Sequence, residues 1–433
     1  MVALTYAGHL LYGANRNDLS LIFSIAWLAA LPLLLTQSWA RQSIDRMPIA
    51  WVGGAFGLVL LVGVLSLTPI FEPHPIWSMA PGAIRAVTID PYSTWLELFK
   101  LLGLAAAFLV GASFGADDER AKQLIQGLLA AGMAYGIWAF LDFVTDRNLL
   151  FGQPRHLDPG RLAASLSSAN IAATFFGALI VLTVADLTRR LERQRERRTG
   201  GFRLRHLEGL LLAIAVPLVG LLVALSCLVL TLSRTGMAAT LAGVVTFLGV
   251  RALLTAKKGA VVGPLIGMLV IVLGLIIAAL ALHMGALGAR MVNFQEDASL
   301  REGLYAAHWN AFLASPWQGY GLGTFKHIND LAITDANREQ LYGVGATHNV
   351  YIQWLEEAGL IGALPMFATI GVIAGRIIRG LAERQRVRLW LLAILSVLGI
   401  FLLHGVTDFP LEVPSMTLFL SLLLGLGYRM ARR

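Results

Sequence analysis

Apolar windows about 20 residues long recur along nearly the whole chain, and a helix of that length spans the hydrocarbon core of a bilayer. Of the 433 residues, 57% are hydrophobic and only 14% are charged, whereas an average soluble domain carries about a quarter charged residues. We therefore predict an all-α polytopic membrane protein with about 11 or 12 transmembrane helices.

Eleven segments have the length and hydropathy of a membrane span. They cover residues 20–36, 50–70, 94–114, 123–145, 166–186, 209–231, 235–254, 261–283, 360–376, 389–405 and 413–430. The segment 1–15 is short and more polar, and it can form either a twelfth span or a re-entrant piece.

The basic residues indicate which loops face the cytoplasm, because cytoplasmic loops are enriched in Lys and Arg. Segment 187–209 holds eight arginines against three glutamates, and segment 376–388 holds five arginines against one glutamate. Threading the spans alternately puts both on one side, together with 37–49, 251–260 and the C-terminal tail. The net charge of +8 is thus explained by membrane orientation, without nucleic acid as a partner.

The opposite face receives the long segment 284–359, which we treat as a unit between the N-terminal spans (1–283) and the C-terminal spans (360–433). Its aromatic side chains can pack on one another, so we expect a small, mostly helical cap over the outer ends of the spans, a cap that is periplasmic if the chain lies in a bacterial inner membrane. Within it, SPWQGYGLGTF (315–325) predicts a turn cluster because of its glycines.

His348 lies just before one of the apolar segments, in the stretch THNVYIQWLEEAGLIG. Thr347 is a plausible N-cap, which places His348 in the first helical turn, where the helix dipole favours a neutral imidazole. The helix is expected to be amphipathic and interfacial, with one polar stripe formed by Asn349, Gln353, Glu356 and Glu357. The alternative is a histidine that only binds water or backbone.

Three arginines are placed on the same face: Arg161, Arg234 and Arg301. Guanidinium groups match phosphate oxygens in bidentate fashion, so several around one cavity suit a diphosphate. The structural alternatives are that Arg161 snorkels, that Arg234 pins its short corner, and that Arg301 pairs with Glu302 or Glu296.

Asp408, between the last two spans, can orient a histidine or an arginine, or can cap a turn before Pro410. His404 is a candidate core histidine. The chain has no Walker loop, no dinucleotide fingerprint, no HExxH motif and a single cysteine, Cys227. We expect neither a nucleotide nor a metal or other cofactor, so the energy of any reaction must arrive in an activated substrate.

Five stretches together resemble the superfamily of O-antigen ligases and O-antigen polymerases of bacterial inner membranes. HNVYIQWLEEAGLIG resembles its His-Asn…Gly-x-x-Gly pattern, and LSRTG, with Ser233 and Arg234, resembles its Ser-Arg corner. GRLAASLSSANIAATF is similar to its Arg…Asn element, with Asn170 matched and Ser168 replacing the first Asn. REGLYAAHWNAFLASPWQGYGLGTF and TDFPLE complete a resemblance covering roughly 85–433, closest to the ligases.

The resemblance implies a multispan, GT-C-like glycosyltransferase in the inner membrane with its active site facing the periplasm. The implied donor is a glycan on undecaprenyl diphosphate, whose chain lies between spans, and the implied acceptor is lipid A–core. Transfer is expected to be inverting and metal-independent. The residues implied in catalysis are His348, Arg161 and Arg234. Those implied in binding the diphosphate or the acceptor are Arg301, Asn349, Asp408, Ser233 and Asn170.

Three alternatives stay open: an O-antigen polymerase that joins lipid-linked repeats, a protein O-oligosaccharyltransferase, and a polyprenol-glycan flippase or transporter. A transporter needs charges along a path through the membrane. The main charges within a predicted span are Glu97 and Lys100 near its outer end, which favours chemistry at the rim over transport.

Overall fold

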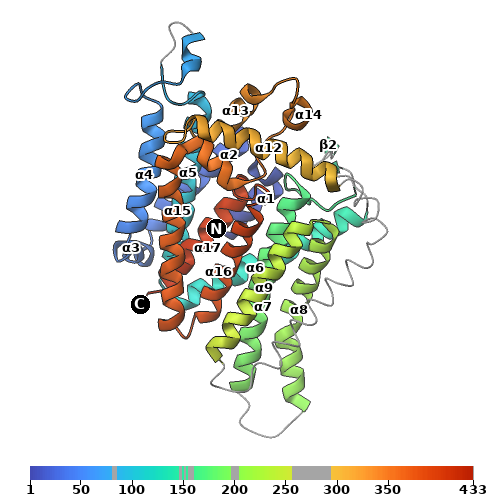
Figure 1. Ribbon diagram of the computed structural model, residues 1–433. Coiled ribbons are helices and arrows are strands. Elements are labelled where there is room, and N and C mark those ends of the chain that lie inside the picture. Colours follow the sequence, from blue (N-terminus) through green and yellow to red (C-terminus); the bar gives the residue numbers. More distant parts are fainter. Residues whose placement is uncertain are drawn as a thin grey trace.

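The computed structural model is a bundle of helices with a helical cap across one end (Figure 1). It describes residues 1–79, 85–145, 149–150, 153–154, 160–196, 204–255 and 294–432. The first half contains α1 (Val2–Leu10), η1 (Tyr12–Ala14), α2 (Asn17–Leu35), α3 (Ser38–Asp45), α4 (Ala50–Ser66), η2 (Pro75–Met79), α5 (Pro91–Gly115), α6 (Asp118–Val144) and α7 (Ala169–Glu196). The second half contains α8 (Leu204–Leu230), α9 (Arg234–Thr255), α12 (Phe294–Ala314), α13 (Phe325–Ala332), α14 (Arg338–Leu341), α15 (Val350–Glu383), α16 (Arg388–His404) and α17 (Pro414–Met430).

The predicted all-α polytopic fold is confirmed. Six helices are long and apolar enough to cross a membrane, namely α2, α5, α6, α7, α9 and α15, and α3 with α4 forms a further candidate bent by 88°. Helices α16 and α17 are each 17 residues long, slightly short of the roughly 20 residues that cross a bilayer unaided. The predicted span 261–283 lies outside the described residues. Within the described residues, the only strands are the two-residue antiparallel pair β1 (Leu149–Leu150) and β2 (Gln153–Pro154).

The N-terminal segment does not form a complete span. Helix α1 has nine residues, about 13 Å at a rise of 1.5 Å per residue. Its buried face packs inside the bundle, where the Tyr6 hydroxyl donates to the carbonyl of Leu128 and His9 Nδ1 lies 2.9 Å from Ser415 Oγ. Of the two interpretations of this segment, the re-entrant piece therefore fits the structure.

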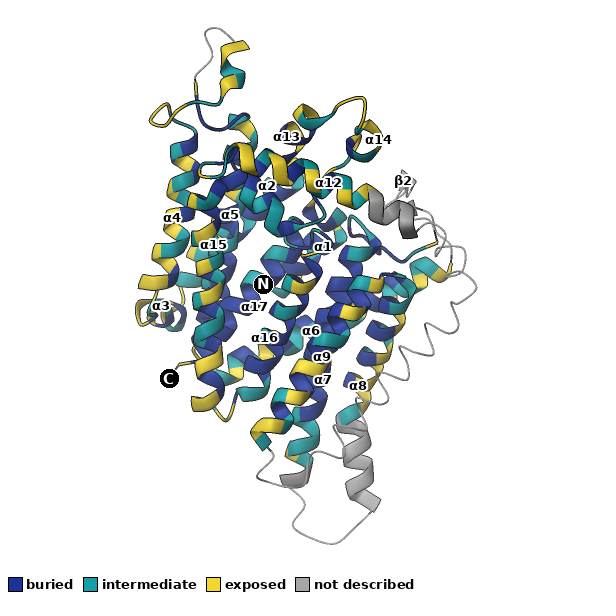
Figure 2. Ribbon diagram, in the orientation of Figure 1, coloured by how far each residue is buried: buried dark blue, intermediate teal, exposed yellow. Residues whose placement is uncertain are grey.

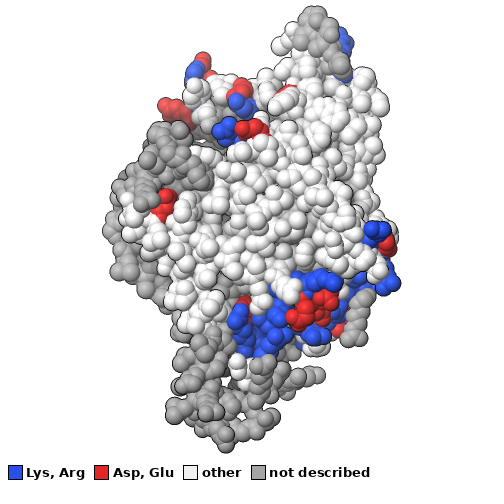
Figure 3. All heavy atoms as spheres, turned by 180° about the vertical axis from the view of Figure 1, so that it is seen from behind, with Lys and Arg blue, Asp and Glu red and all other residues white. Residues whose placement is uncertain are grey.

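On the face drawn in Figure 3, charged side chains gather towards the two ends of the bundle and leave a broad, mostly uncharged band between them. At one end, which we call the basic end, Arg384 pairs with Asp118 and Arg429 donates to the carbonyl of Ser43. The opposite end carries α12, α13 and α14 and is called the cap end (Figure 1). This separation matches a bundle whose middle faces lipid.

Helices α5 and α17 pack closely at the centre of the bundle, where buried residues are concentrated (Figure 2). A Cβ atom added to Gly111 of α5 would overlap the carbonyl oxygen of Leu422, and one added to Gly425 of α17 would overlap that of Phe108. Small residues let two backbones approach in this way inside membranes. This contact holds α17, and with it the loop before α17, in place.

Replacing Gly425 with valine is expected to destabilise the bundle by about 1–3 kcal/mol, because the new side chain meets backbone that cannot rotate away. The loss appears as a lower midpoint of thermal unfolding in detergent. Gly399→Val on α16 is the matched control, since nothing lies within 4 Å of the added Cβ there. Equal midpoints for the two variants would contradict the close α5–α17 contact.

Candidate functional site

His348 lies immediately before helix α15, not in its first turn. Asn349 is the N-cap, and its side-chain oxygen accepts from the backbone N–H groups of Tyr351 and Ile352 at 3.1 Å each. His348 has a left-handed backbone (φ 53°), which costs a non-glycine residue about a kcal/mol. The Tyr305 hydroxyl of α12 donates to the carbonyl of His348 at 2.9 Å and helps to hold this conformation.

Two predictions for this segment are therefore wrong. Thr347 does not cap α15; it is buried, and its hydroxyl donates to Gln353 Oε1 at 2.9 Å. The stripe containing Gln353, Glu356 and Glu357 does not face an interface, because all three side chains are buried under the cap. Since His348 precedes the N-cap, the helix-dipole argument for its neutrality does not apply.

The polar stripe instead connects the cap to α15 through hydrogen bonds. The carboxylate of Glu357 accepts from the backbone N–H groups of Gly323 and Phe325 at 2.6 and 3.2 Å. Helix α15 breaks at Gly359 (φ 57°, ψ −176°), where its freed N–H groups donate to the carbonyls of Pro316 and Trp317. The predicted turn cluster 315–325 is confirmed and lies against this break.

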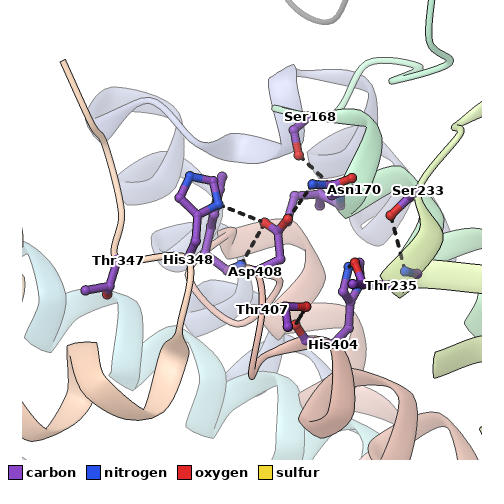
Figure 4. Close-up of polar contacts among 12 residues, drawn as sticks. Ser168, Asn170, Ser233, Thr235, Thr347, His348, His404, Thr407 and Asp408 are labelled. Atoms are coloured by element: carbon purple, nitrogen blue, oxygen red, sulfur yellow. Dashed lines mark hydrogen bonds and ion pairs between the residues drawn. The ribbon is translucent and has the colours of Figure 1, made fainter. Parts of the chain in front are cut away.

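Asp408 is the centre of the polar cluster in Figure 4, and its side chain has no solvent exposure. Its Oδ1 accepts from the backbone N–H of Phe409 at 2.9 Å and lies 3.5 Å from His348 Nδ1. Its Oδ2 accepts from Asn170 Nδ2 at 2.5 Å. Asp408 therefore contacts a histidine and also accepts within its own turn, which fits both possibilities that the sequence offers for it.

The surroundings of Asp408 keep its carboxyl ionised. Burial by itself raises the pKa of this group, but His348, His404 and the Phe409 N–H together outweigh burial and hold the pKa of Asp408 below its ordinary value. The 3.5 Å contact with His348 is an ion-pair distance rather than a well-formed hydrogen bond. Such contacts often shorten when substrate binds.

Arg161 joins this cluster through Asn170, the second residue of α7. Its Nη2 donates to Asn170 Oδ1 at 2.6 Å, so Asn170 connects the arginine to Asp408. Its Nε donates to the carbonyl of Thr231 at 2.9 Å, at the corner between α8 and α9. Arg161 thus lies between the start of α7 and the corner between α8 and α9. Its side chain is half-buried and does not extend into lipid.

The corner 231–236 carries Ser233 and Arg234. Ser233 Oγ accepts from the N–H of Gly236 and caps α9, while Leu232 before it has a left-handed backbone (φ 52°). Arg234 is the first residue of α9 and its side chain is exposed. Its neighbour Thr235 lies with Oγ1 3.1 Å from His404 Nε2, so the corner adjoins the Asp408 cluster.

Arg301 of α12 lies on the cap side of the same cluster. Its charge acts on both Tyr305 and His404. The pKa of the Tyr305 phenol is raised, mainly by burial. The charge of Asp408 raises this pKa further, whereas the charge of Arg301 lowers it. The site therefore gathers Arg161, Arg301, His348 and Asp408 around one region, with Arg234 at the adjoining corner.

Two residues of this site were not assigned to it from the sequence. Tyr305 lies four residues after Arg301 on α12, and this spacing puts both on one helix face, a signal present in REGLYAAHW. His404 was considered a core histidine, and it is buried. However, its ring nitrogens contact Thr174 Oγ1 at 2.6 Å and Thr235 Oγ1 at 3.1 Å, and its carbonyl accepts from the N–H of Asp408.

The arrangement suits acid–base chemistry next to an anion. His348 is about one-third exposed and can reach a substrate, whereas Asp408 behind it is fully buried. The arginines supply positive charge on the same side. Within the described ranges, no group of three or more His, Cys, Asp or Glu side chains is arranged to hold a metal ion.

These features define a polytopic helical membrane protein with a polar site at one rim of its bundle. Residues 219–367 match the protein-family profile described as O-antigen ligase. The predicted resemblance is confirmed: this part of the chain, which includes Arg234, Arg301 and His348, is similar to the O-antigen ligase family, whose members are glycosyltransferase-like ligases and polymerases. The comparison with curated proteins gave no match.

The attachment of the cap is expected to depend on pH through His308 of α12. This buried ring contacts Glu356 Oε2 through Nδ1 at 2.6 Å and Asn329 Oδ1 through Nε2 at 3.2 Å, and it stacks on Phe325. Burial lowers the pKa of His308 from 6.5 to about 4. Between these values His308 takes up a proton only in the unfolded state, so the contribution of His308 to stability falls by about 3 kcal/mol as pH drops from 6.5 to 4.

Hydrogen exchange of α12, α13 and α14 measures this effect, with faster exchange expected at pH 4.5 than at pH 6.5 after correction for intrinsic rates. In His308→Gln the extra exchange at low pH should disappear. His327→Gln is the control, because the side chain of His327 is about half exposed. Unchanged pH dependence in His308→Gln would contradict the assignment.

Proposed function

We propose that this protein is an O-antigen ligase that transfers a glycan from undecaprenyl diphosphate to a sugar of lipid A–core at the periplasmic face of the bacterial inner membrane. The match of residues 219–367 to the O-antigen ligase profile supports glycosyl transfer as the reaction class. The observation that carries the proposal is the connected series His348–Asp408–Asn170–Arg161, which joins a candidate base to a candidate diphosphate ligand through contacts of 3.5, 2.5 and 2.6 Å.

The proposed orientation follows from the two ends of the bundle. Lys and Arg concentrate at the basic end (Figure 3), and cytoplasmic loops are enriched in these residues. The basic end then faces the cytoplasm, and the cap end, with His348 and Asp408, faces the periplasm. A lipid-linked donor carries its activated sugar there without nucleotide.

In the proposed reaction, an acceptor hydroxyl attacks the anomeric carbon of the donor sugar. Since Nδ1 of His348 faces Asp408, a proton held on Nδ1 leaves the lone pair of Nε2 to accept the hydroxyl proton. The new glycosidic C–O bond forms as the bond between sugar and diphosphate breaks. A single displacement of this kind inverts the anomeric configuration.

The leaving group is undecaprenyl diphosphate, on which negative charge accumulates as the bond breaks. Arg161 and Arg234, with Arg301 from the cap, are the groups we assign to stabilise this charge without a metal ion. Ser233 and Asn349 are proposed to act indirectly, because their side chains cap α9 and α15 and so fix Arg234 and His348.

Reconstitution with lipid-linked glycan and lipid A–core, without nucleotide or divalent metal, tests the proposal. Glycan on lipid A–core is the expected product. Longer glycan still attached to the polyprenol would identify a polymerase, and intact lipid-linked glycan moved across the vesicle membrane would identify a flippase.

Replacing His348, Arg161 or Arg234 with alanine should each lower the transfer rate about 100-fold or more, because each removes either the proton acceptor or charge on the leaving group. The rate of glycan transfer to lipid A–core in the same vesicles is the measurement. Arg338→Ala is the control, since Arg338 is an exposed arginine of the cap that stacks near Tyr342. Full activity of Arg234→Ala would remove that residue from the leaving-group assignment.

Tyr305→Phe should lower kcat about 3- to 10-fold with little change in KM, because it removes the hydrogen bond to the His348 carbonyl and leaves the ring in place. The exposed cap residue Tyr342, replaced in the same way, should give wild-type kinetics. A Tyr305→Phe enzyme with unchanged kcat would show that this contact does not position His348.

A further inference from the structure

A cavity of about 210 Å³ lies among helices α4, α5, α15 and α17. Its walls are almost entirely apolar and include Val52, Phe56, Phe108, Ile370, Ile373 and Leu424. Apolar cavities of about 150 Å³ stay dry and accept small hydrocarbons. This larger and half-open one has room for part of an acyl chain.

Arginines lie directly beyond the basic end of this cavity. On α15, Arg376 follows the cavity residue Ile373 by one helical turn, and its guanidinium is 4.6 Å from the ring centre of Tyr428. The Tyr428 ring contacts Phe108 of the cavity wall at 5.6 Å, and its hydroxyl donates to the carbonyl of Pro48. Tyr428 therefore lies where the apolar cavity meets the arginines.

Positive charge at this point is not balanced by carboxylates. Arg429 is only 9% exposed, and the charges that act on it are those of Arg376, Arg432, Arg384 and Arg46. Among these five, Arg384 pairs with Asp118. No other ion pair involves them within the described part of the chain, although Glu383 lies near enough to act on Arg376.

The hydrogen bonds of these arginines leave donors for a ligand. Arg429 and Arg376 each use Nε, for the carbonyls of Ser43 and Tyr428 respectively. Their Nη atoms form no hydrogen bond to any described residue. Several guanidinium groups with open donors around a half-buried point match the oxygens of a phosphate group.

We infer that the protein binds an anionic phospholipid here, with its phosphate headgroup among Arg46, Arg376, Arg429 and Arg432 and part of an acyl chain in the cavity. General attraction of anionic lipids to a basic surface needs only exposed charges. Here, one of the arginines is largely buried and an apolar cavity lies next to it, which together fit one bound lipid with a defined position.

The arginines of the proposed headgroup site lie at the opposite end of α17 from the candidate catalytic site. Asp408 precedes the first residue of α17, whereas Arg429 is near its last, and a helix of this length spans about 25 Å. The inference therefore does not depend on the proposed glycosyl transfer, and it can be tested without donor or acceptor.

Binding is measured by native mass spectrometry of the delipidated full-length protein, with phosphatidylglycerol and phosphatidylcholine of identical chains. One tightly retained phosphatidylglycerol is expected, with phosphatidylcholine at least tenfold weaker. The double variant Arg46→Gln/Arg432→Gln should weaken phosphatidylglycerol binding about 25-fold, because each basic residue near an anionic headgroup contributes about fivefold. The control Arg193→Gln/Arg386→Gln removes the same charge from exposed positions near Glu119 and should bind as wild type.

The cavity is tested by Thr369→Phe, which fills it from α15, against Ile361→Phe on an exposed part of the same helix. Only the first should weaken phosphatidylglycerol binding. Equal retention of both lipids, or equal losses in the two double variants, would overturn the inference. The inference would also be overturned if inorganic phosphate alone displaced phosphatidylglycerol, or if the protein retained undecaprenyl phosphate in preference to phosphatidylglycerol.

Discussion

The carboxylate of Asp408 is fully buried, and an ionised group in that position is stable only with donors and positive charge around it. Those partners come from separate parts of the chain: Asn170 from α7, His348 from the segment before α15, and a backbone N–H from its own loop. The requirement to satisfy one carboxylate thus brings together α7, α15 and the loop between α16 and α17. Arg161 joins the cluster because it donates to Asn170 Oδ1, while Nδ2 of the same Asn170 donates to Asp408.

The cap depends on the same principle. Glu356 and Glu357 are buried at the start of α15, and their partners lie in the cap: His308 for the first, and the N–H groups of Gly323 and Phe325 for the second. Because Tyr305 lies on the same helix as His308, fastening α12 through His308 also delivers the hydroxyl that holds the His348 carbonyl. Burial of polar groups in the cap and the geometry of the candidate base are therefore linked.

The sequence was sufficient to predict the helical membrane fold, because long apolar segments leave few other structures possible. It also pointed to His348, Asp408, Asn170 and Arg161 as separate candidates. It could not predict that Asn170 connects Arg161 to Asp408, because that contact joins residues far apart in the chain. Thr347 and Asn349 are both good N-caps, and the choice between them depends on the left-handed backbone of His348. The stripe at Glu356 was predicted to be interfacial because its partners, which lie up to 48 residues away, could not be identified from the local sequence.

The contact between Asn170 and Asp408 joins residues 238 positions apart. At translation rates of roughly 5 to 20 residues per second, about 12 to 48 seconds separate the synthesis of the two. During that interval, the half of the site on α7 is already in the membrane without its carboxylate. A nascent chain therefore lacks the complete polar cluster until the loop between α16 and α17 has been made, so the cluster is among the last parts of the structure to form.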